Sequence, residues 1–140
     1  MALLTKAWAK ALNDYSLGKA ALPTMGNVWL ALFAQNPGPD GLLTSEPSGG
    51  NYSRLALTAS MSATDLATAV SSNTTYLQFA TASGSWGTSA LSYWGVMDSA
   101  TVGAGTMRFY GPLTPSLTVG AGDAPPLPEG TISIGFKIVD

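Results

Sequence analysis

Two carboxylates, Asp98 and Asp123, are the residues whose types most directly suggest catalysis. Two carboxyl groups a few ångströms apart can hydrolyse a glycosidic bond. Each of these two, however, lies at the end of an expected strand or in a Gly-rich turn, where Asp commonly accepts hydrogen bonds from nearby backbone. The chain also has no His and no Cys, which excludes imidazole bases and thiolate nucleophiles. We therefore expect turn-forming aspartates and no enzyme.

Four aromatic side chains could instead form a platform on which sugar rings stack: Trp86, Tyr93, Trp94 and Tyr110. The alternative is that they fill the core, pack in turns or lie at a subunit interface. Trp86 falls in a turn, whereas Tyr93 and Trp94 face opposite sides of one expected strand. This distribution favours the core or an interface over a glycan-binding platform.

Metal, nucleotide and nucleic-acid sites are not expected. Asp40-Gly41 and Gly120-Ala-Gly-Asp123 have too few neighbouring acids for Ca²⁺, which takes about six to eight oxygen ligands. Gly103-Ala-Gly105 lacks the third Gly and the helix of a dinucleotide-binding loop. The six basic residues are spread along the chain, so no cluster could neutralise several phosphates. We expect no cofactor and no nucleic-acid partner.

The first element expected to position other residues is an amphipathic helix over residues 2–17. Its apolar face has helical spacing and consists of Leu4, Trp8, Ala11, Leu12 and Tyr15. Gly18 suits the C′ position that ends a helix. Trp8 and Leu12 either face the domain core or dock into a groove of a partner.

From residue 28 the hydrophobic period changes to two, which is typical of β-strands. Residues 28–33 are apolar on both faces, so we expect a central strand there. Further strands are expected at 52–58, 75–80, 90–98, 106–111, 116–119 and 132–138, separated by turns rich in Gly, Pro and Ser. The pattern predicts an all-β fold, an antiparallel β-sandwich or jelly-roll-like domain with one N-terminal α-helix. We assign residues 1–140 to a single domain, with the sandwich over 28–140.

The alternation also predicts which strand side chains are buried. Arg54 and Arg108 should point outward from their strands. Pro112 and Pro115 should break the chain between two strands. The side chains expected to face inward are Leu55, Leu57, Leu77, Phe79, Met107, Phe109, Ile132, Ile134, Phe136 and Ile138. Gly95 inside its strand suggests a bulge or a close approach of another backbone.

A long loop over residues 34–51 is the best candidate for contacting a partner. Loops of this length without secondary structure are uncommon in compact domains and often carry function. Pro37, Pro39 and Pro47 restrict the free loop, so ordering it on binding costs less entropy. A solvated connection would have the same composition, and both interpretations stay open.

Six segments resemble a family of small phage proteins described as tail-fibre-like. In chain order they are Leu17-Gly18, Val28-Trp-Leu-Ala-Leu-Phe33, Glu46-Pro-Ser-Gly-Gly-Asn-Tyr52-Ser-Arg54, Gly84-Ser-Trp-Gly-Thr88, Tyr93-Trp-Gly-Val-Met-Asp98 and Leu113-Thr-Pro-Ser-Leu-Thr-Val-Gly-Ala-Gly-Asp123. The segments keep the family's order along nearly the whole chain. The Pro-rich segment over residues 124–128 departs from the family pattern, and the chain has no fibre shaft. The resemblance implies a role in the virion and supplies no catalytic residues.

The sequence therefore predicts a non-enzymatic structural protein of a bacteriophage virion. Only 10% of its residues are charged, and a weakly charged surface favours association with other protein. Without coiled-coil, collagen-like or β-helix repeats, we expect a capsid decoration or cement protein on the particle exterior. The alternatives are a tail-fibre or tail-tip-associated protein and a carbohydrate-binding receptor-recognition module.

The expected partners are other copies of the chain, as a dimer or trimer, and a larger virion protein, either the major capsid protein or a tail component. A glycan is a further candidate ligand. No membrane partner is expected, since no stretch has the roughly 18 apolar residues of a transmembrane helix. The virion would assemble in the bacterial host cytoplasm. The candidate interface residues are Trp8, Leu12, Pro37, Pro39, Pro47, Tyr52, Trp86 and Trp94.

Overall fold

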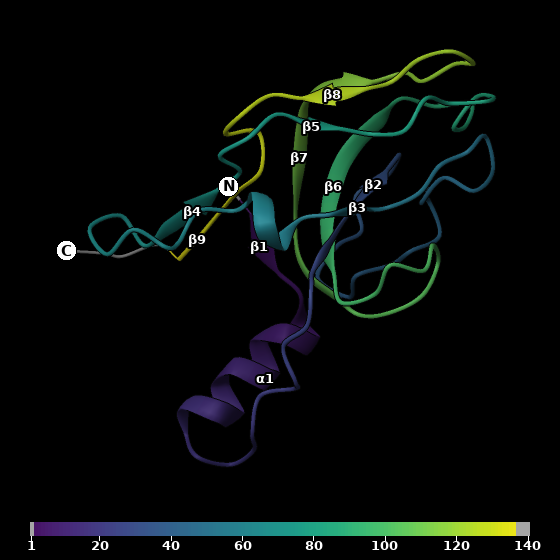
Figure 1. Cartoon of the computed structure of the whole chain (residues 1–140). Helices are drawn as coiled ribbons and strands as arrows, with labels where there is room; N and C mark the ends of the chain where they lie inside the picture. The colour runs from purple at the N-terminus through teal and green to yellow at the C-terminus, as the bar shows by residue number, and fades with distance from the viewer. Residues whose placement is uncertain (1, 137–140) are drawn as a thin grey trace.

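The computed structural model describes residues 2–136 and consists mostly of antiparallel strands with one α-helix (Figure 1). In chain order the elements are β1 (Leu3–Leu4), α1 (Lys6–Ser16), β2 (Trp29–Phe33), β3 (Leu55–Ala56), the 3₁₀ turn η1 (Thr58–Ser60), β4 (Val70–Ser72), β5 (Leu77–Gln78), β6 (Leu91–Met97), β7 (Met107–Leu117), β8 (Pro126–Leu127) and β9 (Ser133–Gly135). The predicted all-β fold with one N-terminal helix is confirmed. Residues 1 and 137–140, including Ile138 of the expected closing strand, lie outside the described residues.

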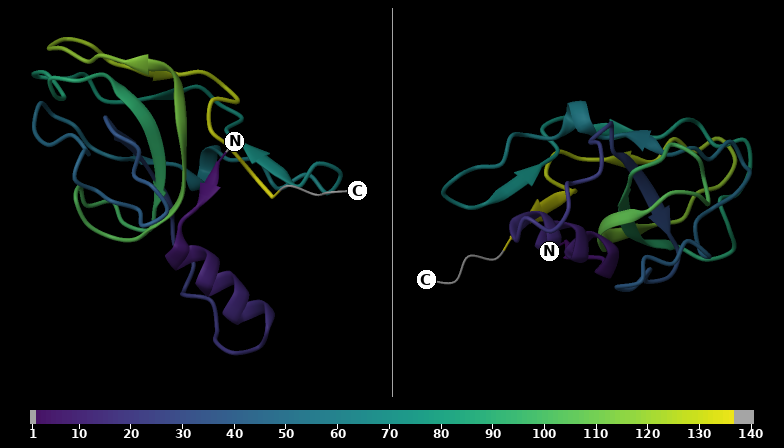
Figure 2. Two further views of the ribbon diagram at one scale, coloured as in Figure 1. Left: turned by 180° about the vertical axis from the view of Figure 1, so that it is seen from behind. Right: turned by 90° about the horizontal axis from the view of Figure 1, so that it is seen from below.

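The strands form one large antiparallel sheet and two small ones. The large sheet has the order β1-β7-β6-β2-β3, and the small ones pair β4 with β9 and β5 with β8. Figure 2 shows that α1 and the β4–β9 pair both project from the body of the molecule. The finer expectation of a jelly roll is not confirmed, and the single domain over residues 1–140 stays a prediction.

Helix α1 begins later than predicted because the first residues pair with the sheet. Leu3 and Leu4 lie opposite Tyr110 and Phe109 of β7. Thr5 then caps the helix, since its Oγ1 accepts a hydrogen bond from the Trp8 N–H at 3.4 Å. The same hydroxyl donates to the Met107 carbonyl at 2.6 Å. Thr5 thereby fixes the start of the helix to the start of β7.

The helix ends at the predicted glycine. Gly18 has φ +66°, its N–H donates to the Tyr15 carbonyl, and the Lys19 N–H donates to the Asp14 carbonyl. These two bonds form a Schellman motif, which needs a left-handed residue at C′.

Strand β2 is buried on both faces, as the sequence predicts. Leu30 and Leu32 belong to the larger core cluster with Trp94, whereas Ala31 and Phe33 belong to a second cluster. Gly95 of β6 lets the side chains of that second cluster pack closely, because it has no side chain of its own. A Cβ there would lie 2.9 Å from both Phe33 Cε2 and Met107 Cε, so the close approach is by side chains rather than by backbone.

The predicted break at Pro112 and Pro115 is wrong, because β7 runs without interruption from Met107 to Leu117. Strand β1 pairs only with Phe109 and Tyr110, so beyond them no described strand covers that edge of β7. Proline is tolerated at such an edge and at bulges because it has no N–H to donate. Pro115 lies within an irregular stretch of β7 that faces residues 91–93 of β6.

Three predicted side-chain orientations are also wrong. Arg54 and Arg108 are buried, with exposed fractions of 4% and 5%, and Phe136 is exposed at 51%. Arg54 lies next to a strand of only two residues, so the alternation expected over residues 52–58 does not extend to it. Leu57, Leu77, Phe79 and Ile132 are buried as predicted.

Candidate functional site

The long loop over residues 34–51 contains no helix or strand, but it is tied to the fold at several points. Ser45 bonds residues 34 and 35: its carbonyl accepts the Ala34 N–H at 3.2 Å, and its Oγ accepts the Gln35 N–H at 3.1 Å. At the far turn, Lys6 Nζ donates to Asp40 Oδ1 at 2.9 Å. The loop therefore has a defined shape before any partner binds.

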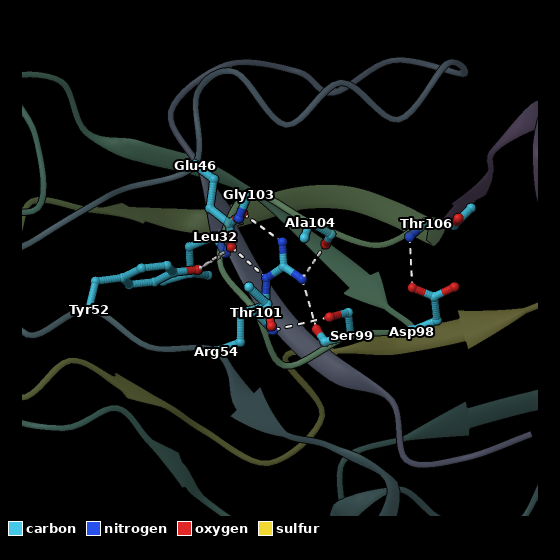
Figure 3. A network of polar contacts seen from close by, with 10 residues as sticks. All are labelled: Leu32, Glu46, Tyr52, Arg54, Asp98, Ser99, Thr101, Gly103, Ala104 and Thr106. Carbon is cyan, nitrogen blue, oxygen red and sulfur yellow. Dashed lines mark hydrogen bonds and ion pairs between the residues drawn. The ribbon is translucent and has the colours of Figure 1, made fainter.

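The strongest tie is a buried ion pair between Glu46 of the loop and Arg54 (Figure 3). Arg54 Nε donates to Glu46 Oε1 and Nη2 donates to Oε2, both at 2.7 Å. The two side chains are 0% and 1% exposed. This two-point geometry is the strong, directional form of an arginine–carboxylate contact.

The same arginine connects the loop to the turn between β6 and β7. Its Nη1 donates to the carbonyls of Ser99 at 2.7 Å and Ala104 at 2.8 Å. The Gly103 N–H donates back to Glu46 Oε2 at 2.9 Å. Figure 3 shows the guanidinium between the carboxylate and these carbonyls. Two surface segments distant in sequence thus become one polar unit.

Tyr52 completes this network from the core side. Its hydroxyl accepts the Leu32 N–H at 3.0 Å and donates to Glu46 Oε1 at 3.2 Å. Burial, followed by the nearby Glu46 charge, raises the pKa of this phenol far above its ordinary value of 10.0. Tyr52 therefore acts as a neutral hydrogen-bonding strut between β2 and the loop.

Three aromatic rings pack beneath the loop. Tyr52 lies 5.1 Å from Trp86 and 6.2 Å from Phe79, measured between ring centroids. Trp86 Nε1 also donates to the Gly50 carbonyl at 2.9 Å, and its side chain is only 3% exposed. The ring supports the loop and presents no free face on which a sugar could stack.

The eight candidate interface residues are placed as follows in the isolated chain: Trp8, Pro37, Pro47, Tyr52, Trp86 and Trp94 are buried, Leu12 is half-buried and Pro39 is exposed. Of the proline positions, Pro39 alone lies on the outer surface of the loop. Three residues further along the loop, Leu42 is 58% exposed. The structure thus leaves a proline and an apolar side chain exposed on a loop that is anchored to the fold.

Asp98 and Asp123 are turn-forming residues, as predicted. Asp98 Oδ1 accepts the Thr106 N–H and Asp123 Oδ2 accepts the Gly120 N–H, both at 2.7 Å. The two aspartates line separate cavities, so the structure does not bring them together as a catalytic pair. Over residues 2–136, no three acidic side chains gather as metal ligands. In the same range no helix is long and apolar enough to cross a bilayer.

The chain matches the model of a known protein family. The model of a family described as Gp80, podophage GP4 fiber I protein gp80, matches residues 4–135, which is nearly the entire chain. A search of curated proteins finds no match.

Proposed function

The chain belongs to the podophage GP4 fiber I protein gp80 family, and from this premise we propose that it is a fibre-type structural protein, acting by protein–protein contact and not by catalysis. The family's description supports a structural role in a phage virion. The match over residues 4–135 is the observation that carries the proposal.

The contact surface proposed for the larger virion protein is the outer side of the loop over residues 34–51. Leu42 and Pro39 are exposed there, and the Glu46–Arg54 pair holds the loop in place. An ordered loop loses little conformational entropy on binding, so more of the contact energy appears as affinity. Few charges need to be desolvated, because both acidic residues of the loop are already paired: Asp40 contacts Lys6 at the far turn, and Glu46 contacts Arg54 inside the fold.

Capsid decoration is the competing placement, and the family's description as a fiber protein favours the tail. A glycan-binding role receives less support from the geometry. Trp86 and Trp94 are 3% and 2% exposed, so neither ring has an open face. A cavity of about 340 Å³ lies beside Trp86 and is lined by residues 44–48 and 85–89, most of which are Ser, Thr or Gly.

The proposal is tested on purified particles. A phage lacking this gene is complemented with tagged wild-type chain, and the tag is located by gold-labelled electron microscopy. We expect label at the tail and a several-fold loss of particle-bound protein for Leu42→Ser. Leu17→Ser is the matched control, since Leu17 is 71% exposed at the end of α1. Label on the capsid shell would replace the fibre placement by decoration, and absence from purified particles would remove the virion role.

A further inference from the structure

Arg108 is a buried cation without a matching anion among the described residues. It is 5% exposed, and its guanidinium carbon lies 4.7 Å above the Trp8 ring. No hydrogen bond or ion pair joins its side chain to any residue in the range 2–136. Asp98 lines a small cavity beside it but accepts a backbone N–H instead. Arg108 therefore places a positive charge at this point of the molecule, and this charge attracts a carboxylate that approaches it.

The same arginine lines an apolar groove of about 340 Å³. The groove lies between α1 with its following linker and the β4–β9 pair, two parts that Figure 1 shows on the same side of the molecule. Its apolar walls are formed by Trp8, Leu12, Met25, Val28, Phe109 and Phe136. Met25 and Phe136 are 56% and 51% exposed. Apart from Arg108, no charged side chain within residues 2–136 lines the groove.

This composition defines the occupant by its chemistry. An apolar side chain would remove the groove walls from water, and an adjacent carboxylate would neutralise Arg108. Two exposed apolar side chains of the described surface directly follow an acidic residue, Tyr15 after Asp14 and Leu66 after Asp65, and Asp14 is already paired with Lys10. Leu66 is 95% exposed, and Asp65 forms no ion pair within the described part of the chain.

The Asp65-Leu66 turn is held in a defined shape. The Asp65 N–H donates to the Val70 carbonyl at 3.0 Å, and the Ala69 N–H donates to the Asp65 carbonyl at 2.7 Å. Asp65 Oδ1 accepts the Ala67 N–H at 2.9 Å, and the carboxylate keeps further acceptor capacity. An exposed leucine is therefore presented beside a carboxylate on a fixed turn.

We propose that the groove receives the Asp65-Leu66 turn of a second copy, so that two copies exchange turns about a two-fold axis. Such an interface needs donor and acceptor surfaces side by side on each copy. Thr64 and Ala69, which flank the turn, line the same groove. Leu66 of one copy enters between Trp8 and Phe136 of the other, and Asp65 meets Arg108. This dimer goes beyond the proposed function and does not depend on where the protein lies in the virion.

The first test measures mass by analytical ultracentrifugation over a concentration series. We expect a dimer for the wild type and dimerisation weakened by about tenfold or more for Leu66→Ser, since two leucines are uncovered per dimer. Asp65→Asn should weaken dimerisation too, because it removes the charge while keeping the turn's acceptor oxygen. Leu42→Ser is the control and should dimerise normally. A wild-type monomer, a trimer, or a dimer indifferent to both variants would overturn the proposal.

The second test locates the contact, and the absence of native cysteines gives it a clean background. Leu66→Cys and Met25→Cys proteins with tags of different size are mixed and oxidised. We expect a disulfide-linked heterodimer on a non-reducing gel. Replacing Leu66→Cys by Leu42→Cys should abolish it, and equal cross-linking of the two mixtures would overturn the proposal. A monomeric chain that still labels the phage tail would remove the dimer alone and leave the proposed function intact.

Discussion

Replacing Arg54 by methionine tests whether the buried ion pair holds the long loop. Arg54→Met retains the aliphatic bulk of the side chain and removes the guanidinium. Glu46 is then left as a 1% exposed carboxylate whose remaining donors are the Tyr52 hydroxyl and the Gly103 N–H. The carbonyls of Ser99 and Ala104 lose their arginine donor as well. The folded state therefore carries an uncompensated buried charge.

The expected cost of this change is large for a chain of this size. Removing one partner of a buried ion pair typically costs about 3–5 kcal/mol. For 140 residues, the entropy of unfolding near the midpoint is about 0.3 kcal/mol per kelvin. The melting temperature should therefore fall by about 10–17 °C. The whole stability of such a domain is only about 5–15 kcal/mol, so at least about a fifth of it is at stake.

The assay is urea unfolding followed by tryptophan fluorescence, combined with calorimetry. Lys6→Met is the control, because it breaks the Lys6–Asp40 pair, whose side chains are 71% and 63% exposed, and should cost less than about 1 kcal/mol. The double variant Glu46→Met, Arg54→Met should lose less stability than the two single variants added together, since no lone charge remains. A melting temperature for Arg54→Met within about 3 °C of the wild type would refute the reasoning.

Three further predictions concern single side chains. Burial and the Glu46 charge raise the folded-state pKa of Tyr52 above 10.0. The contribution of Tyr52 to the free energy of unfolding is therefore complete below pH 10, and above pH 10 it falls by about 1.4 kcal/mol per pH unit as the unfolded phenol ionises. Urea unfolding at pH 10 and 11 should show this loss of stability in the wild type and not in Tyr52→Phe. Gly111→Ala should destabilise by about 1–3 kcal/mol, because its Cβ would lie 2.7 Å from Trp94 Cζ2; a calorimetric trace that matches the wild type would contradict the packing. Thr5→Ala should cost about 1–2 kcal/mol and speed amide exchange in the first turn of α1, whereas Thr5→Ser, which retains the hydroxyl, should behave nearly as the wild type.

Short apolar segments bounded by turn residues could be predicted from the sequence. Residues 29–33 and 91–97 are strands close to the expected ranges, because a short apolar or aromatic-rich run between turns is typical of a buried strand. Gly18 marked the end of α1 correctly, since its left-handed φ is a local requirement. The start of the helix was missed because the pairing of Leu3 and Leu4 with β7 joins segments about a hundred residues apart in the chain.

The continuous strand β7 could not be read from its own residues. Proline ends most central strands. Whether Pro112 and Pro115 end this strand depends on what pairs with each of its edges. That information lies in β1, which contacts β7 at only two positions. The sequence shows the prolines but does not show that this edge of β7 is uncovered.

The polar network was missed for a related reason, and the composition contained the signal. The alternation of a strand predicts only toward which side of the sheet Arg54 points. Whether Arg54 is buried depends on Glu46, which lies in a loop without a periodic pattern. The chain has just six basic and eight acidic residues, too few to keep its surface hydrated by charge. Most of the described charged side chains are exposed, whereas both arginines are buried. Arg54 is paired inside the fold, and Arg108 is buried facing an apolar groove. Because charged residues are so few in this chain, we expect each of the two arginines to hold two protein segments together and not to serve as an ordinary surface residue.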